Sequence, residues 1–170
     1  MRAFGAILAV LAAVTVPAHA HITIETQQAV AGTYYKAVLR IGHGCEGTPT
    51  HTIRVRIPDG MVAVKPMPKH GWQLKTTIGK LAEPISDGHG GQITEGVREI
   101  TWSGGKLLDE HYDEFVFRGR LPDKPGEVLH IPVVQECEKG IHRWIEIPAP
   151  GKSADDYKEP APALKLLPKP

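Results

Sequence analysis

The stretch Thr52-Ile53-Arg54-Val55-Arg56-Ile57, followed by Pro58-Asp59-Gly60, decides the fold class of this 170-residue chain. Its apolar side chains recur at every second position, which places Ile53, Val55 and Ile57 on one face of an extended strand. The Pro-Asp-Gly sequence then turns the chain. The same period of two recurs along the sequence between turn residues, which is typical of β-sandwiches. We therefore predict an all-β protein, a single β-sandwich domain in which helices are short or absent.

The other segments with this alternation are also predicted to be strands. They comprise residues 21–25, 34–41, 61–65, 72–77, 98–103, 112–118, 128–136 and 142–147. The most apolar of them, residues 128–136, is expected to be central. Glycine enrichment predicts a mobile loop over residues 83–96 and a turn at Gly104-Gly105.

The first 20 residues have the composition of a secretory signal peptide. A positive start, Met1-Arg2, precedes an apolar run over residues 4–16, and Ala18-His19-Ala20 supplies the small side chains of a cleavage site. At roughly 13 residues, the run is shorter than the about 20 that span a bilayer. We therefore predict cleavage after Ala20 and a periplasmic or secreted product that begins at His21 and has no membrane anchor.

Removal of this segment leaves about 150 residues, enough for one domain. It also removes Arg2, so the 20 basic residues of the chain become 19, equal to its 19 acidic residues. Such a balance gives no basic field for nucleic acid. We expect the domain to cover residues 21–150. The Pro-, Ala- and Lys-rich tail, residues 151–170, is expected to be partly disordered, with Leu164, Leu166 and Leu167 docking as a last extended piece.

The chain has two cysteines, Cys45 and Cys137. Because exported proteins keep such pairs oxidised, we predict a disulfide. In the chain-entropy model, closing a loop of this length contributes at most about 4 to 5 kcal/mol. The alternative is a thiolate metal site formed by Cys45 with His43.

His21 acquires metal-binding chemistry through the predicted cleavage. An amino-terminal histidine offers its α-amine and its ring nitrogen Nδ1, which together close a six-membered chelate ring on one metal ion. If residues 21–25 and 34–41 form a hairpin about Ala31-Gly32, His43 approaches this terminus.

The last predicted strand provides two more candidate site residues, His142 and Trp144. Alternation assigns Ile145 and Ile147 to the core and places His142, Trp144 and Glu146 on the opposite face. The predicted disulfide brings the His43 loop towards this strand. We therefore expect His21, His43, His142 and Trp144 to converge at one end of the sandwich.

Nitrogen donors of this kind favour late divalent ions, so Cu(II) is the expected metal and zinc the second choice. No Gly-x-Ser-x-Gly, phosphate-binding loop, His-Glu-x-x-His or Cys-x-x-Cys motif competes with this interpretation. The carboxylate pairs Asp109-Glu110 and Asp113-Glu114 are interpreted as solvated surface. Met61 and Met67 are too few to favour a Cu(I) thioether site.

Several of these motifs, in order, resemble the YcnI-like family of exported bacterial copper proteins. The similarity is carried by His21-Ile-Thr-Ile-Glu25, residues 31–40, residues 43–50, residues 64–69 with Gly71-Trp72, residues 112–117 and Trp144. This resemblance implies a cupredoxin-like or fibronectin-like sandwich that binds Cu(II) through a single-histidine brace at His21, with Trp144 beside the metal. His43 and His142 are then optional additional ligands.

The expected function is that of a periplasmic copper chaperone or buffer without catalytic residues. Its expected partners are the copper ion and another periplasmic copper protein or transporter. Two alternatives remain: a copper oxidase or monooxygenase that uses a histidine brace, and a metal-free adhesion sandwich. An acidic ligand is not assigned, since Glu46, Glu114 and Glu136 are all candidates and Glu25 lies roughly 13 Å along the strand from His21.

Overall fold

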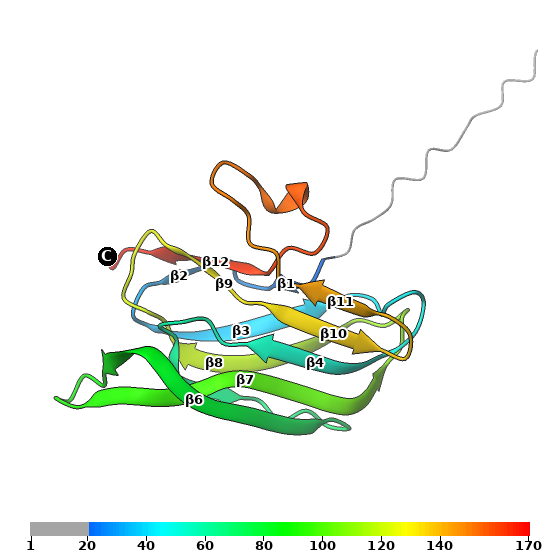
Figure 1. The fold of residues 1–170 in the computed structure, drawn as a ribbon, viewed down its shortest axis with the longest axis horizontal. Coiled ribbons are helices and arrows are strands. Elements are labelled where there is room, and N and C mark those ends of the chain that lie inside the picture. The colour runs from blue at the N-terminus through cyan, green and yellow to red at the C-terminus, as the bar shows by residue number, and fades with distance from the viewer. Residues whose placement is uncertain (1–20) are drawn as a thin grey trace, which may run out of the picture.

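The computed structural model describes residues 21–170, so the predicted signal segment, residues 1–20, lies outside the described residues. Two antiparallel sheets form the body of the molecule (Figure 1). The four-stranded sheet has the order β1 (Thr23–Ile24), β3 (Tyr34–Ile41), β8 (Asp113–Arg120) and β5 (Val62–Pro66). The five-stranded sheet has the order β11 (Ile141–Trp144), β10 (Val133–Cys137), β4 (Thr50–Arg56), β7 (Gln92–Leu107) and β6 (Gln73–Ser86).

The core lies between these two sheets. Ile53 and Val55 on β4 are fully buried, as the alternation predicts. Phe115 on β8 packs edge-on against Trp102 on β7, with ring centroids 5.6 Å apart. Burial of these large side chains supplies the main stabilising term of the fold. The predicted all-β sandwich is therefore confirmed.

The carboxyl-terminal segment is part of this sandwich. A third, three-stranded sheet has the order β2 (Gln28–Val30), β12 (Ala163–Leu167) and β9 (Val128–His130). Leu164 and Leu166 on β12 are fully buried in the common core. The boundary expected at residue 150 therefore does not mark the end of the folded domain, because β12 contributes buried apolar side chains to the core.

Residues 83–96 are not the loop that their glycines predicted. They belong mostly to β6 and β7, which form a long antiparallel hairpin closed by a turn at residues 87–91 (Figure 1). Gly104 and Gly105 likewise lie inside β7. A Cβ atom at Gly105 would lie 2.0 Å from Cε2 of Trp72, so this glycine lets the indole pack directly on the strand.

The apolar segment 128–136 is divided rather than a single central strand. Pro132 separates β9, in the three-stranded sheet, from β10, in the five-stranded sheet. Proline cannot donate a ladder hydrogen bond, which explains the change of sheet at this position. β10 lies between β11 and β4, next to the edge of its sheet.

Tyr35 holds the connection between β1 and β2. Its hydroxyl group donates a hydrogen bond of 2.6 Å to the carbonyl oxygen of Thr26. Burial of the phenol, followed by the negative charge of Glu25, raises the pKa of Tyr35 to about 12.

Candidate metal centre

His21 is placed by the pairing of β1 with β3. Thr23 is the register partner of Arg40, and Ile24 is the partner of Leu39. If this antiparallel register is extended by two residues, His21 lies at the position of Gly42, beside His43. The predicted approach of the His43 loop to the start of the domain follows from this register.

His142 and Trp144 point into the sandwich, because they oppose Gln135 and Val133 on β10 and those two side chains are buried. Residues directly opposite each other in an antiparallel pair share one face of the sheet. Trp144 is accordingly only 3% exposed.

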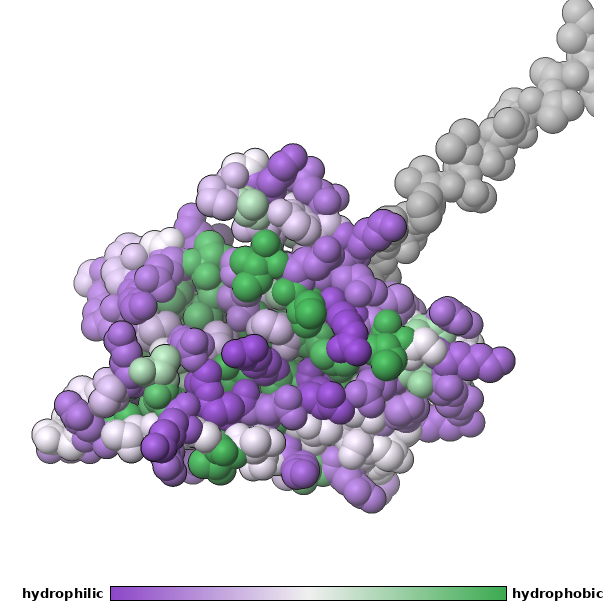
Figure 2. Space-filling view, viewed as in Figure 1, coloured by the Kyte–Doolittle hydropathy of each residue, from purple (hydrophilic) through white to green (hydrophobic). Residues whose placement is uncertain are grey.

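The predicted face assignment of this segment was therefore wrong. Ile145 and Ile147, expected in the core, are 45% and 58% exposed. The strand ends at Trp144, so the alternation was extended beyond the element that produces it. Together with Ile141, these residues are large apolar side chains exposed to solvent, and Figure 2 shows a band of apolar residues across this face near β9, β10 and β11.

Three imidazole rings gather around the indole of Trp144. The ring centroid of Trp144 lies 5.7 Å from that of His21, 6.3 Å from that of His43 and 5.1 Å from that of His142. The rings of His43 and His142 are 5.7 Å apart. The sequence therefore correctly predicted that these four residues converge, although Trp144 belongs to the core rather than to a polar face.

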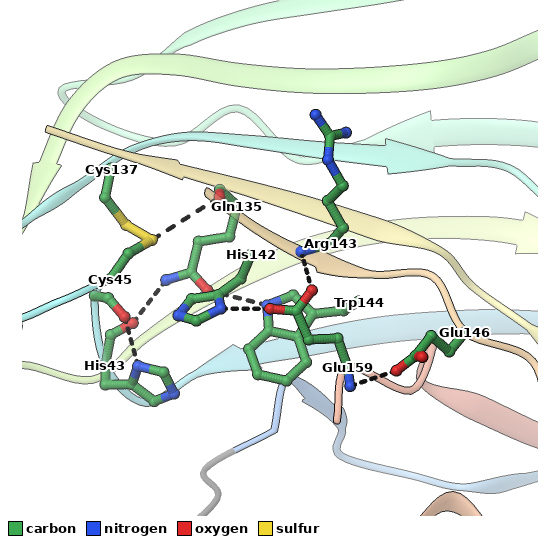
Figure 3. A network of polar contacts seen from close by, with 10 residues as sticks. His43, Cys45, Gln135, Cys137, His142, Arg143, Trp144, Glu146 and Glu159 are labelled. Carbon is green, nitrogen blue, oxygen red and sulfur yellow. Dashed lines mark hydrogen bonds and ion pairs between the residues drawn. A yellow bond between two sulfur atoms is a disulfide. The ribbon is translucent and has the colours of Figure 1, made fainter. Parts of the chain in front are cut away.

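Gln135 holds this cluster together (Figure 3). Its Nε2 group donates hydrogen bonds of 2.7 Å to the carbonyl oxygen of His43 and 2.8 Å to Oγ1 of Thr50. Its Oε1 atom accepts a hydrogen bond of 3.1 Å from Nε1 of Trp144. Gln135 was not predicted from the sequence. An amide two residues after Val133 in an apolar strand is a signal that could have identified it, because a buried amide requires partners.

The ring nitrogens of two histidines have oxygen partners. Nδ1 of His43 donates to the carbonyl oxygen of Gly44, and Nδ1 of His142 donates to Oε1 of Glu159 at 2.6 Å. With the proton on Nδ1, the lone pair of each neutral ring is on Nε2. Metal-binding histidines commonly have this arrangement, in which the second ring nitrogen donates to a carbonyl or carboxylate oxygen.

The domain of unknown function DUF1775 matches residues 21–166. The chain belongs to this family. YcnI-like domains are members of DUF1775. No curated protein matches the chain.

A crystal structure of an uncharacterized protein from Nocardia farcinica, described as having an immunoglobulin-like fold, is similar to this DUF1775 domain. The identity is 21%, the TM-score is 0.65, and the match covers 86% of this chain and 98% of the other. The shared feature is the immunoglobulin-like sandwich. Within residues 21–170, no helix is long and apolar enough to cross a membrane.

A disulfide fixes the His43 loop of the DUF1775 domain to β10. Cys45 and Cys137 are bonded, with their Cα atoms 5.7 Å apart, as predicted. The alternative thiolate site is thereby removed, since neither sulfur is a thiol. The amide of Gly44 also donates a hydrogen bond of 2.8 Å to Oδ1 of Asp109, which gives the loop a second attachment.

Of the glutamates considered as ligands, Glu25, Glu114 and Glu136 pair with arginine side chains. Glu136 accepts a hydrogen bond of 2.8 Å from Arg54. Glu114 accepts from the hydroxyl of Tyr112 and pairs with Arg40, which also lies 3.7 Å from Glu25. Glu46 is exposed in a turn, with φ of 49°.

The carboxylate pairs interpreted as solvated surface also have structural partners. Asp109 binds the Gly44 amide, and Asp113 binds Nζ of Lys69 at 2.6 Å. Glu159, which was not among the residues predicted from the sequence, contacts the histidine cluster through Nδ1 of His142.

The donor chemistry of this cluster fits a nitrogen-bound divalent ion. Within residues 21–170, no three or more histidine, cysteine, aspartate or glutamate side chains are grouped to hold a metal ion. A terminal chelate does not need such a group, because His21 alone supplies both the amine and Nδ1. This amine would form only if the peptide bond before His21 were cut, as the sequence predicts.

Proposed function

We propose that this protein is an exported Cu(II)-binding protein, a copper chaperone or buffer, and that the processed amino terminus of His21 holds the ion. The observation that supports it most directly is the convergence of the His21, His43 and His142 rings on Trp144. The residue that acquires the amine on processing is thus already within a cluster of imidazoles. Copper is the cargo of this proposed activity.

The ligand chemistry favours copper over other divalent ions. Amine and imidazole nitrogens follow the general order of affinities in which Cu(II) binds most tightly, and Cu(II) accepts tetragonal nitrogen coordination. The α-amine and Nδ1 of His21 form the chelate, and the indole of Trp144 shields one side of it. His21, His43 and His142 are all half-buried, so the site is open enough to take up and release an ion.

A Cu(II) titration of protein that begins at His21, followed by electron paramagnetic resonance, tests this function. We expect one nitrogen-coordinated Cu(II) per chain and loss of that signal in His21→Ala. His89→Ala is the control, because His89 is exposed in the β6–β7 turn. Binding that is equal in His21→Ala and unaltered protein, or absent from both, would contradict the proposal.

The proximity of His43 and His142 favours one second candidate, a copper oxidase or monooxygenase. Such an enzyme needs an additional histidine next to the terminal brace, and both rings are beside Trp144. Ascorbate consumption with formation of hydrogen peroxide distinguishes the two functions. A buffer slows this reaction relative to unbound Cu(II), whereas an oxidase accelerates it. A sandwich that serves adhesion without metal would bind no copper in the titration.

A further inference from the structure

Residues 148–160, here called the 148–160 loop, form a closed surface loop beside the histidine cluster. The two ends of the loop are held together at Glu146. Its amide donates a hydrogen bond of 3.1 Å to the carbonyl oxygen of Glu159, and its carbonyl oxygen accepts one of 2.9 Å from the amide of Ala161. A compact loop with joined ends is an Ω-loop, a class that frequently has a function. The loop projects from the sheets next to β11 and β12 (Figure 1).

The loop has an ordered interior and faces His21. Its one helical turn, η1 (Ala154–Asp156), is preceded by Ser153, whose amide donates a hydrogen bond of 2.9 Å to Oδ2 of Asp156. The hydroxyl of Tyr157 accepts a hydrogen bond of 3.0 Å from the amide of Ala149. Residues 155–158 and His21 together line a pocket of about 330 Å³.

Glu159 connects the loop to the histidine cluster (Figure 3). Its Oε1 atom accepts a hydrogen bond of 2.6 Å from Nδ1 of His142, and its Oε2 atom accepts one of 2.8 Å from the amide of Arg143. Both carboxylate oxygens are therefore used on adjacent residues of β11. The carboxylate is also partly shielded, since the side chains of Glu159 and His142 are 30% and 29% exposed. Two contacts fix the plane of the carboxylate and, through it, the orientation of the imidazole.

We infer that Glu159 is a positioning residue that prepares His142 as a second imidazole ligand of the copper held by His21. The inference rests on the proposed function. A carboxylate that accepts from Nδ1 keeps the ring in the tautomer with its lone pair on Nε2 and increases the basicity of that atom. The same carboxylate attaches the end of the 148–160 loop to β11, and residues 155–158 of that loop line the pocket beside His21.

The tautomer of His142 provides a test that needs no copper. Nitrogen-15 NMR of the metal-free protein should show the proton of His142 on Nδ1. In Glu159→Ala the ring should shift towards the mixture seen in unstructured histidine. Glu146→Gln is the matched control, because it changes a neighbouring carboxylate that contacts the amide of Glu159 and not His142. A native His142 ring with its proton on Nε2 would overturn the inference.

Copper binding provides the second test. Glu159→Ala and His142→Gln should each remove the signal of one imidazole nitrogen from the electron paramagnetic resonance spectrum of the bound copper. Each should also weaken Cu(II) binding by about 10- to 100-fold. Glu146→Gln should bind like the unaltered protein. Glu159→Gln is a milder variant that guards against misfolding. Its side-chain amide has one oxygen and can accept only one of the two hydrogen bonds from His142 and Arg143, so it should give an intermediate loss of Cu(II) affinity.

The outcomes separate this inference from the proposed function. If Glu159→Ala and His142→Gln bind Cu(II) with native affinity and an unchanged nitrogen pattern, while His21→Ala does not bind, the function stands and the role of Glu159 is wrong. If the unaltered protein binds no Cu(II), both are wrong. Circular dichroism of each variant establishes that the sandwich is intact.

Discussion

The side chain of Gln135 is 1% exposed and makes hydrogen bonds to the His43 loop, to β4 and to Trp144. We expect Gln135→Leu to lower the free energy of unfolding by about 3 kcal/mol, because it leaves buried polar partners unsatisfied. Urea denaturation of the metal-free protein measures this loss. Gln27→Leu, at an exposed position, should change stability by less than about 0.5 kcal/mol. A Gln135→Leu variant as stable as the control would contradict the role assigned to this amide.

Trp144 should report copper binding, because its ring is within 5.7 Å of the ring of His21. Addition of Cu(II) should quench its fluorescence, and Trp144→Phe should lose most of the quenching while Trp72 and Trp102 continue to emit. The variant should also be destabilised by about 1 to 2 kcal/mol, since it removes the hydrogen bond to Gln135. Quenching that is unchanged in Trp144→Phe would place the copper near another tryptophan.

The sequence was sufficient to predict which side chains converge, but not the direction in which Trp144 points. Cys45 and Cys137 indicated the proximity of two distant segments, and the structure contains that disulfide. The orientation of Trp144 depends on its register with Val133, and register is a tertiary property. Glu159 could not be predicted, because its contact with His142 requires the 148–160 loop to return to β11.

At the scale of elements, the disulfide joins the loop before β4 to the end of β10, across 92 residues of sequence. The variant Cys45→Ser/Cys137→Ser should lose up to about 4 to 5 kcal/mol of unfolding free energy, since a closure of this length is removed from the unfolded chain. Cu(II) affinity should fall as well, because the His43 loop loses its covalent connection. Chemical denaturation with and without a reductant measures the stability term. A loss below about 1 kcal/mol would show that packing alone holds the loop.

On β9, burial lowers the pKa of His130 below its ordinary value. The unfolded chain therefore takes up a proton at this residue more readily than the folded protein does. The contribution of His130 to the free energy of unfolding is fully present above about pH 6.5, the pKa of histidine in the unfolded chain. It decreases as the pH falls below that value and through the lower pKa of the folded state.

We expect His130→Gln to reduce the loss of thermal stability that the metal-free protein shows as the pH falls below about 6.5. His89→Gln, at an exposed turn, should behave like the unaltered protein. Melting temperatures measured across this pH range provide the comparison. An unchanged pH dependence in His130→Gln would contradict the effect of burial.

The elements that were wrongly predicted from the sequence either have no buried face or contain a glycine that is required by side-chain packing. Residues 83–96 are mostly exposed in the β6–β7 hairpin, so no alternation between core and solvent marks them as strand. Gly105 was interpreted as a turn residue, whereas it is a strand residue on which Trp72 packs. In contrast, Ile53 and Val55 have one buried face, and their strand was predicted correctly.

At the scale of the whole molecule, the first residue of the described chain and the 148–160 loop meet at the candidate site. His21 lies beside the end of β3, and the 148–160 loop, which leads into β12, lines the same pocket. β12 is also paired in parallel with β2, close to the first strand. The domain therefore holds its first residue against the rest of the fold, as a metal site at a processed terminus requires.

The central claim is that copper is bound by the amine of His21 and not only by its ring. An unperturbed α-amine titrates at about 7.7 to 8.0 and must lose its proton to bind, so affinity should rise with pH through this range. The decisive measurement compares Cu(II) affinity for protein that begins at His21 with that for protein carrying one extra residue before His21. The account predicts that the extended form loses the tight site as completely as His21→Ala does. Equal affinity of the extended and processed forms would contradict it and would assign the copper to internal side chains such as His43 and His142.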